Sequence, residues 1–303
     1  MAVKPDYKKH GFIPQAQKGL LIMRIRNKAG NMTSEQMRRV AELAEQYGKG
    51  QVHVTNRQGV EIPGVKEADF EQAHQAIIDA GLLPAVCGPR VRPVVACPAT
   101  DTCPYGLLNA RALAEKLDDD FVGRDLPAKT KFAVSGCPNS CTKPEAHDVG
   151  FKGVIEPIIA QDACVKCGAC VKRCPARAMA IDTELTIDYS KCLACGVCIK
   201  LCPKKALTEG RKGYHVYVGG KGGRYSYEGQ LVAKYVSEKN IFPYLDALLE
   251  AYKDLAGKGE RLNLVVEKYG IAQLKAKVEE KLDSDEEIIA RLAKFEQKNT
   301  KAV

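Results

Sequence analysis

The chain has 303 residues, 45% of them hydrophobic and 27% charged, which is typical of a soluble globular protein with two or three domains. Its net charge is +9, but the basic residues are dispersed, only 6% of residues are aromatic and Trp is absent, which argues against nucleic-acid binding. No apolar run is long enough for a membrane span and the start has no apolar signal core, so we expect a cytoplasmic protein without membrane insertion.

The first 84 residues predict an α+β sandwich of alternating strands and helices that follows an irregular polar arm at 1–19. Residues 20–26 alternate as a strand and place Arg24 and Arg26 on one face. Thr33 and Gln36 form a capping box that opens a helix, which Gly48 ends. The remaining elements are strands at 51–55 and 60–62 and a helix at 67–80.

The middle of the chain carries two pairs of cysteines in short Pro-containing segments. They are spaced C-x5-C, then 33 residues, then C-x3-C, and are Cys97, Cys103, Cys137 and Cys141. This is not the double C-x2-C spacing of a zinc ribbon, whereas four thiolates suit an iron–sulfur cube. Around them we expect irregular structure at 82–103, a helix at 106–117, a strand at 131–134 and another strand from Asp148.

The cysteine pattern resembles the sirohaem/[4Fe-4S] sulfite and nitrite reductase superfamily. The flanking segments Arg92–Cys97 and Leu126–Lys131 resemble its arginine and paired-lysine segments. The chain looks most like the catalytic C subunit of anaerobic sulfite reductases, and next like dissimilatory sulfite reductase subunits. The resemblance implies a ferredoxin-like half-domain at 1–84 and a sirohaem domain in which Cys141 bridges the cube and the sirohaem iron.

The resemblance also assigns roles to residues that would otherwise be solvated surface charges or a polar turn. The turn at 55–59 would contact the sirohaem carboxylates through Asn56, Arg57 and Gln58. The substrate anion would be bound and protonated by Arg24, Arg92, Lys129 and Lys131.

An internal repeat of period 28 follows, and each copy reads C-x2-C-x2-C-x3-C-P, the run of bacterial two-cluster ferredoxins. In such runs the fourth cysteine ligates the other cluster. The predicted sets are Cys164, Cys167, Cys170 and Cys202 for one cube, and Cys192, Cys195, Cys198 and Cys174 for the other. Zinc is the weaker alternative. The segment 158–208 would be an inserted 2[4Fe-4S] ferredoxin domain, and Cys87 is left over as a small buried hydrophobe.

A strand at 214–218 runs into a glycine-rich turn, Gly219–Arg224. The turn resembles a Gly/Lys-rich turn beside the sirohaem, which makes Lys221 and Arg224 candidate cofactor contacts; a flexible hairpin loop is equally compatible. We expect helices from Gln230 to Tyr269 and an amphipathic helix at 284–298. The sirohaem domain would then comprise 85–157 and 209–303.

These features predict a reductase that converts sulfite to sulfide with six electrons, using sirohaem and three [4Fe-4S] clusters. Nitrite reduction by the same fold and a non-catalytic electron-transfer subunit remain alternatives. No GxGxxG nucleotide fingerprint is present, so the electrons would come from an external donor protein or a redox partner subunit. The resemblance further implies a homo- or hetero-oligomer.

Overall fold

The first unit is organised by β2 (Leu20–Arg26), in which every second side chain is buried. The computed structural model describes residues 5–282. Leu21, Met23 and Ile25 are buried in the core of this unit. Arg24 and Arg26 therefore lie on the opposite face of the strand, as the two-residue period predicts.

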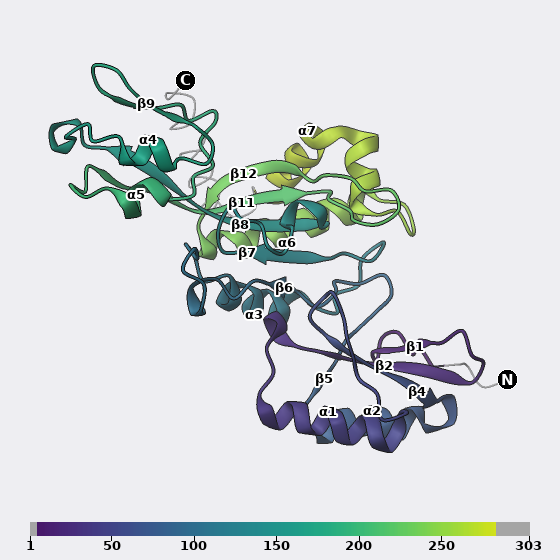
Figure 1. The fold of residues 1–303 in the computed structure, drawn as a ribbon. Helices are drawn as coiled ribbons and strands as arrows, with labels where there is room; N and C mark the ends of the chain where they lie inside the picture. The colour runs from purple at the N-terminus through teal and green to yellow at the C-terminus, as the bar shows by residue number, and fades with distance from the viewer. Residues whose placement is uncertain (1–4, 283–303) are drawn as a thin grey trace.

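The sheet of the first unit is antiparallel in the order β1-β2-β4-β3, with β5 paired to β2. Its strands are β1 (Phe12–Pro14), β2, β3 (His53–Val54), β4 (Val60–Lys66) and β5 (Leu83–Pro84). The helices α1 (Ser34–Tyr47) and α2 (Phe70–Asp79) cover one face (Figure 1). The first nineteen residues are thus not wholly irregular, since β1 adds a strand at the sheet edge.

The capping box of α1 is present in full. The backbone N–H of Gln36 donates to Thr33 Oγ1 at 3.1 Å, and the backbone N–H of Thr33 donates to Gln36 Oε1 at 2.9 Å. These two bonds satisfy donors that a helix N-terminus leaves without partners.

The second unit is a mixed five-stranded sheet in the order β12-β11-β8-β7-β6. The strands β6, β7 and β8 are parallel, whereas β8, β11 and β12 are antiparallel. Their bounds are β6 (Val95–Ala96), β7 (Phe132–Ser135), β8 (Val149–Ile159), β11 (Leu207–Val218) and β12 (Gln230–Val236). One buried core joins this sheet to α3 (Ala110–Phe121), α6 (Glu238–Leu255) and α7 (Leu262–Leu282).

Two predicted elements of this unit were wrong in part. The helix α3 begins at Ala110 and not at Gly106, because the Asn109 side chain caps it by accepting from the Ala112 N–H at 3.0 Å. Residues 230–236 form the strand β12 instead of a helix, since they complete a hairpin with β11, and the helix begins only after Ser237. The predicted helix at 284–298 lies outside the described residues.

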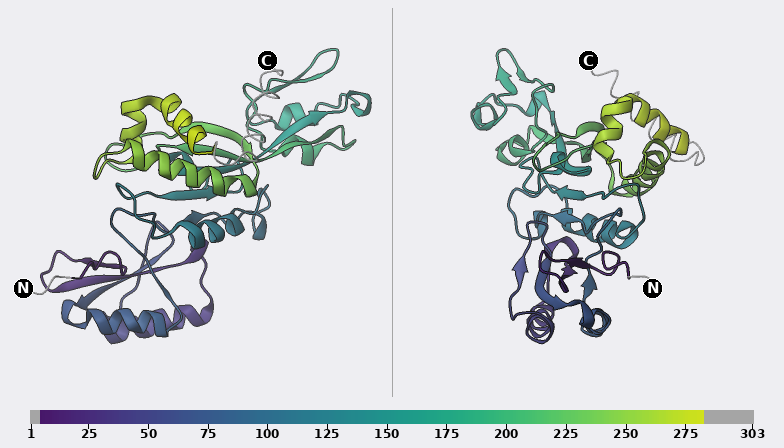
Figure 2. Two further views of the ribbon diagram at one scale, coloured as in Figure 1. Left: turned by 180° about the vertical axis from the view of Figure 1, so that it is seen from behind. Right: turned by 90° about the vertical axis from the view of Figure 1, so that its right-hand side faces the viewer.

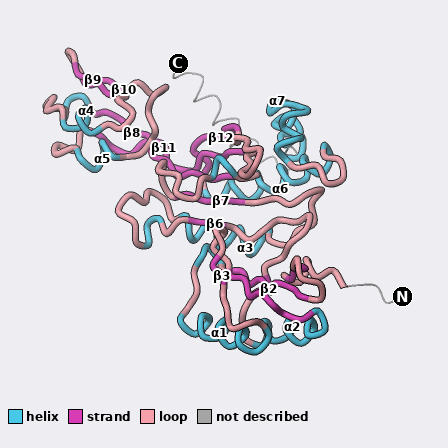
Figure 3. The backbone as a smooth tube through the Cα atoms, turned by 45° about the vertical axis from the view of Figure 1, so that its right-hand side comes forward, coloured by secondary structure: helices cyan, strands magenta, loops and turns pink. Residues whose placement is uncertain are grey.

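Residues between β8 and β11 leave the sheet and form a projecting segment. It contains α4 (Ala169–Arg173), β9 (Met179–Ile181), β10 (Leu185–Ile187) and α5 (Val197–Leu201). Figure 2 and Figure 3 show it standing away from the first unit, with the mixed sheet between them. Its buried apolar cluster is small and includes Cys170, Met179, Leu185 and Leu207.

The first two units are joined by a buried ion pair. Arg26 Nη1 lies 3.1 Å from Asp118 Oδ2, and the Asp118 side chain is fully buried. The face of β2 that carries the arginines is therefore turned towards the second unit. Between residues 5 and 282, no helix is long and apolar enough to cross a membrane.

Candidate functional site

Strand topology brings the first four cysteines together. β6 and β7 are parallel neighbours, so their C-terminal ends lie at the same edge of the sheet, and Cys97 follows β6 while Cys137 follows β7. The backbone N–H of Gly136 donates to Cys97 Sγ at 3.2 Å. Cys103 is held by its own N–H, which donates to the Ala99 carbonyl at 2.8 Å.

The four thiols are close enough to influence one another electrostatically. Burial raises the pKa of Cys137, and the thiols of Cys97, Cys141 and Cys103 raise it further. Cys137 is buried, whereas Cys141 is exposed. Cys97 and Cys103 are partly buried, so Cys141 is the most exposed residue of the set and is accessible to a further ligand.

The polar turn at 55–59 docks against the segment that leads into Cys97. The Gln58 side-chain amide makes two bonds to Ala96: its Nε2 donates to the carbonyl at 2.7 Å, and its Oε1 accepts from the N–H at 2.9 Å. Arg57 Nη2 donates to the Pro93 carbonyl at 2.7 Å. Asn56 is exposed on the same turn.

Arg57 has an unsatisfied donor at this position. Its Nη1 is buried and has no hydrogen-bond partner among the described residues. Burial lowers the pKa of Arg57 to about 10; Asp148 opposes that shift, while Arg92 and Arg24 add to it. A buried guanidinium with a free N–H fits an anionic ligand such as a carboxylate.

The two predicted lysines, Lys129 and Lys131, lie just before β7, and several cations lie close enough to Lys131 to affect its pKa. Burial lowers the pKa of Lys131 to about 8, and Arg57, Arg261 and Lys129 lower it further against the opposing effect of Asp148. The structure thus groups Arg57, Lys129 and Lys131, although Arg57 is far from the two lysines in the sequence.

Arg24 and Arg92 lie close enough to Arg57 and to each other for their charges to interact. Arg24 Nε forms an ion pair with Glu61 Oε1 at 2.8 Å, and its Nη1 donates to Cys87 Sγ at 3.1 Å. Burial lowers the pKa of Arg92, Cys87 opposes this, and Arg24 adds to it. Cys87 is buried as predicted, but its contact with a guanidinium was not foreseen from sequence.

Three further residues, Asp148, Arg261 and His147, lie among these cations. Asp148 precedes β8, is fully buried, and accepts from the Lys131 backbone N–H at 2.9 Å. Arg261 Nη2 reaches both oxygens of Asp148 at 2.7 Å. Burial lowers the pKa of His147 to about 4, with Arg57 the next cause, so this imidazole is neutral at pH 7. The only sequence signal was the placement of Asp148 at the start of a strand.

The glycine-rich turn lies against the loop that follows Cys141. The Gly219 N–H donates to the Asp148 carbonyl at 2.8 Å, and a Cβ at Gly220 would lie 2.1 Å from the Glu145 carbonyl oxygen. Lys221 and Tyr227 exchange backbone hydrogen bonds at 2.8 Å, which closes a hairpin. Lys221 is half-buried and Arg224 is exposed on this hairpin.

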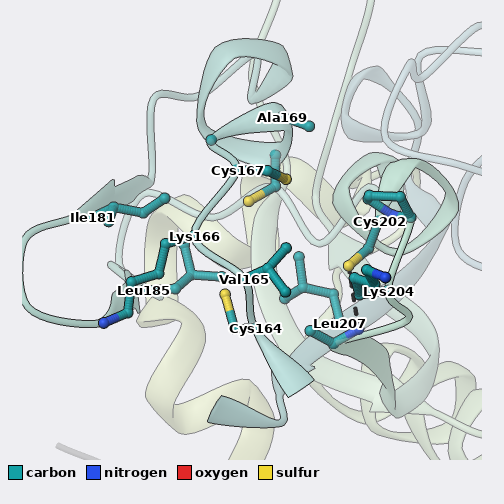
Figure 4. Close-up of a pocket in the computed structure, with 14 residues that line it drawn as sticks. Cys164, Val165, Lys166, Cys167, Ala169, Ile181, Leu185, Cys202, Lys204 and Leu207 are labelled. Atoms are coloured by element: carbon teal, nitrogen blue, oxygen red, sulfur yellow. Dashed lines mark hydrogen bonds between the residues drawn. The ribbon is translucent and has the colours of Figure 1, made fainter. Parts of the chain in front are cut away.

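The projecting segment contains two hollows, each lined by four cysteines. The outer hollow is lined by Cys164, Cys167, Cys170 and Cys202 (Figure 4). The inner hollow is lined by Cys174, Cys192, Cys195 and Cys198. Each hollow draws its fourth cysteine from the other copy of the repeat.

The cysteines line the two hollows, and this arrangement bears on whether each set could hold a single metal ion. A single tetrahedral Zn²⁺ brings its sulfur ligands to within roughly 4 Å of one another. In the part of the chain that the structure describes, no three His, Cys, Asp or Glu side chains are arranged to hold one metal ion. Four cysteine side chains around a hollow fit the four-thiolate ligand set of an iron–sulfur cluster.

Comparison with known proteins assigns this fold and cysteine arrangement to a class of iron–sulfur oxidoreductases. The family model described as "Nitrite and sulphite reductase 4Fe-4S domain" matches residues 87–285, and the "Nitrite/Sulfite reductase ferredoxin-like half domain" matches residues 13–80. The chain belongs to the nitrite and sulfite reductase family.

The similar proteins include enzymes named as sulfite reductases. The chain is 38% identical over 275 residues to the coenzyme F420-dependent sulfite reductase of Methanocaldococcus jannaschii, covering 89% of this chain but only 44% of that protein. It is 28% identical over 180 residues to a subunit of the anaerobic sulfite reductase of Salmonella typhimurium, covering 54% and 52% of the two chains. A crystal structure of dissimilatory sulfite reductase I superposes with a TM-score of 0.70 at 20% identity, over 86% and 69% of the two chains, which supports the fold.

Proposed function

We propose that this protein is a sirohaem-dependent sulfite reductase that converts sulfite to sulfide. The balanced reaction consumes six electrons and eight protons for each sulfite dianion and yields one hydrogen sulfide and three water molecules. The observation that carries the proposal is the cluster of Lys131 and Arg261 around Asp148, in the same unit as the four-thiol set, with Arg57 of the first unit docked against it. A reaction of an anion that consumes protons needs both fixed positive charge and proton donors.

The residues present fit the proposed cofactors. Cys97, Cys103, Cys137 and Cys141 would hold one cube, and the exposed thiol of Cys141 would also ligate the sirohaem iron. The free Nη1 of Arg57 offers a donor for a sirohaem carboxylate. Around it, the further contacts of this kind would come from Asn56, Gln58, Lys221 and Arg224. When bound, the sirohaem and its coupled cube would supply the electrons and an iron atom that binds the substrate.

The chain's own residues would bind the anion and supply its protons. Arg24 and Arg92 would hold sulfite oxygens through charge-assisted hydrogen bonds. Lys129 and Lys131 would donate protons as the S–O bonds break. A pKa of about 8 leaves Lys131 largely protonated at pH 7 and yet a much better acid than an ordinary lysine.

The domain arrangement completes the proposal. Residues 1–84 would form the half-domain, 85–157 with 209–303 the sirohaem domain, and 158–208 a ferredoxin domain with two further [4Fe-4S] clusters. We propose a cytoplasmic enzyme that receives electrons from an external donor protein or partner subunit. A second half-domain would come from another subunit of a homo- or hetero-oligomer.

The decisive experiment is an assay of the anaerobically purified protein with reduced methyl viologen and either sulfite or nitrite. We expect the absorption bands of sirohaem, and a kcat/KM for sulfite well above that for nitrite. The reverse order would make the protein a nitrite reductase. Sirohaem bands without turnover of either anion would make it an electron-transfer subunit.

The variant Lys131→Met tests the role of this lysine in the same assay. It should keep the absorption spectrum of the cofactors and lose turnover. Turnover that is unchanged in this variant would contradict the role of Lys131 while leaving the cofactor assignment intact.

A further inference from the structure

The geometry points to a fixed direction for electron flow through the projecting segment. An iron–sulfur cluster held by Cys164, Cys167, Cys170 and Cys202 in the outer hollow would be reduced by an acidic one-electron carrier protein that docks beside Lys166 and Lys204. The cluster of the inner hollow would then take up each electron and pass it to the cube held by the four-thiol set of Cys137. This inference rests on the proposed function and names the kind of partner that feeds it.

The inner hollow is attached to the body of the protein. The Ile155 N–H donates to the Ala194 carbonyl at 2.8 Å, and Ala194 is only 2% exposed. Leu107, Cys137 and Ile155 form one buried cluster, against which Ile199 of α5 packs. The cysteines of the inner hollow therefore lie on the side of the segment that contacts the Cys137 loop.

A second contact fixes the same orientation. Lys200 of α5 donates from Nζ to the Pro104 carbonyl at 3.0 Å, directly after Cys103. A side chain at Gly196 would come within 3.4 Å of Leu107. The helix that follows Cys195 is thus fastened to the loop that holds two thiols of the four-thiol set.

The internal repeat provides a comparison of equivalent positions in the two hollows. With a period of 28 residues, Lys166 corresponds to Ala194, and Lys204 corresponds to Ala176. Lys166 and Ala194 share a left-handed backbone, with φ of 54° and 52°. The backbone is therefore alike at both hollows, but the outer one carries two lysines where the inner one carries two alanines.

The surroundings of the outer hollow suit a docking surface for an acidic protein. Lys166 and Lys204 line it and are exposed, and none of the described residues that line it is acidic (Figure 4). Val165, beside them, is 58% exposed and adds an apolar contact. The described lining of the inner hollow contains no charged residue. Positive charge at a docking site accelerates the encounter with an acidic partner, and the effect weakens with salt.

The test follows the reduction of the holoprotein's iron–sulfur absorbance in a stopped-flow instrument, without sulfite. The probe is reduced plant-type [2Fe-2S] ferredoxin, an acidic carrier that gives up one electron per encounter, and the comparison reductant is methyl viologen radical. Lys166→Glu/Lys204→Glu should lower the second-order rate constant for ferredoxin about tenfold at low ionic strength and flatten its salt dependence. Reduction by methyl viologen should not slow.

The control is Lys18→Glu/Lys239→Glu, which makes the same change in net charge at two exposed positions outside the segment. It should react with ferredoxin nearly as fast as the wild type. Equal rates in all three proteins, or equal slowing in both variants, would overturn the docking assignment.

The order of the relay is tested by Cys167→Ser, which removes a ligand of the outer hollow only. Ferredoxin should then reduce the remaining centres at least tenfold more slowly, and methyl viologen should still reduce them. Undiminished reduction by ferredoxin would overturn the order. Because none of these measurements needs sulfite turnover, a protein that accepts electrons but leaves sulfite unchanged would refute the proposed function and not this inference.

Discussion

Arg261 and Asp148, which lie 113 positions apart in the chain, form a bidentate ion pair at the centre of the candidate active site. The carboxylate is fully buried, and its second role is to accept the Lys131 backbone N–H. Asp148 is therefore the anion around which the cations of the site are arranged, and it connects the segment that leads into α7 to the start of β7.

Loss of this carboxylate should destabilise the fold. Asp148→Asn leaves Arg261 and the neighbouring cations without their countercharge, and breaking a buried pair in this way costs about 3–5 kcal/mol. Urea unfolding of the apoprotein measures the change. The control is Glu280→Gln, which breaks the exposed pair with Lys277 and should change stability by less than about 1 kcal/mol. Similar small losses in both variants would contradict the role of Asp148.

The rate of the reaction should fall on the alkaline side as Lys131 loses its proton. Its pKa of about 8 means that the protonated donor prevails below that pH and the neutral amine above it. We therefore expect kcat to decline as the pH rises through about 8. Lys131→Arg stays charged across this range and should remove the decline while lowering kcat, and Lys131→Met should lower kcat about 10²-fold.

The pH profile of Asp148→Asn supplies a second check on the same group. Asp148 raises the pKa of Lys131, so its neutralisation should move the alkaline decline to lower pH. A decline that keeps its position in both Lys131→Arg and Asp148→Asn would assign the titration to another residue.

The glycine turn should tolerate a methyl group at one position and not at another. A Cβ at Gly220 would lie 2.1 Å from the Glu145 carbonyl oxygen, so Gly220→Ala must push the hairpin away from the loop after Cys141. At Gly222 the nearest atom, the Ala146 carbonyl oxygen, is 3.9 Å from such a Cβ. We expect Gly220→Ala to lose sirohaem from the purified protein and Gly222→Ala to retain it. Equal sirohaem content by absorbance would show that the turn does not shape that site.

Iron analysis should separate the cysteines into distinct groups. Cys141→Ser should lose the coupling between sirohaem and its cube, seen in the absorption and electron paramagnetic resonance spectra. It should lose at most about two fifths of the iron (one cube and the sirohaem iron), because the other two sets of four thiols remain. Cys87→Ser should retain all the iron, since Cys87 contacts Arg24 and belongs to none of the three sets. An iron loss in Cys87→Ser equal to that in Cys141→Ser would contradict this grouping.

Short-range sequence patterns correctly predicted the features that depend only on residues close together in the chain. The capping box at Thr33 and the facing of Arg24 and Arg26 follow from helix and strand periods, and both are present. The family relationship implied by the spacing of Cys97 to Cys141 is confirmed by the matching family model. The two crossed cysteine sets remain a prediction, which the two cysteine-lined hollows support.

These short-range patterns could not predict contacts between residues that are far apart in the chain. Nothing near Arg261 in the sequence marks it as the partner of Asp148, because the pairing depends on how the fold brings the segment before α7 against the residue that precedes β8. Residues 230–236 contain residues compatible with either a helix or a strand, and only the pairing with β11 decides for a strand. The difference between Lys166 and Ala194 is visible in the sequence. Only the structure shows that Ala194 is bonded to Ile155 of β8, which makes its hollow the inner one and leaves Lys166 at the outer one.

The two ends of the projecting segment leave from adjacent points of one sheet. Ile159 at the end of β8 pairs with Leu207 at the start of β11, and just beyond them the Ala160 N–H donates to the Ala206 carbonyl at 2.8 Å. A tight hairpin could therefore join β8 to β11 across this gap, with the loss of the contacts that Ala194, Ile199 and Lys200 make with the body of the protein. The segment therefore has the geometry of an insertion between two paired strands, since its removal would leave the pairing of β8 with β11 in place.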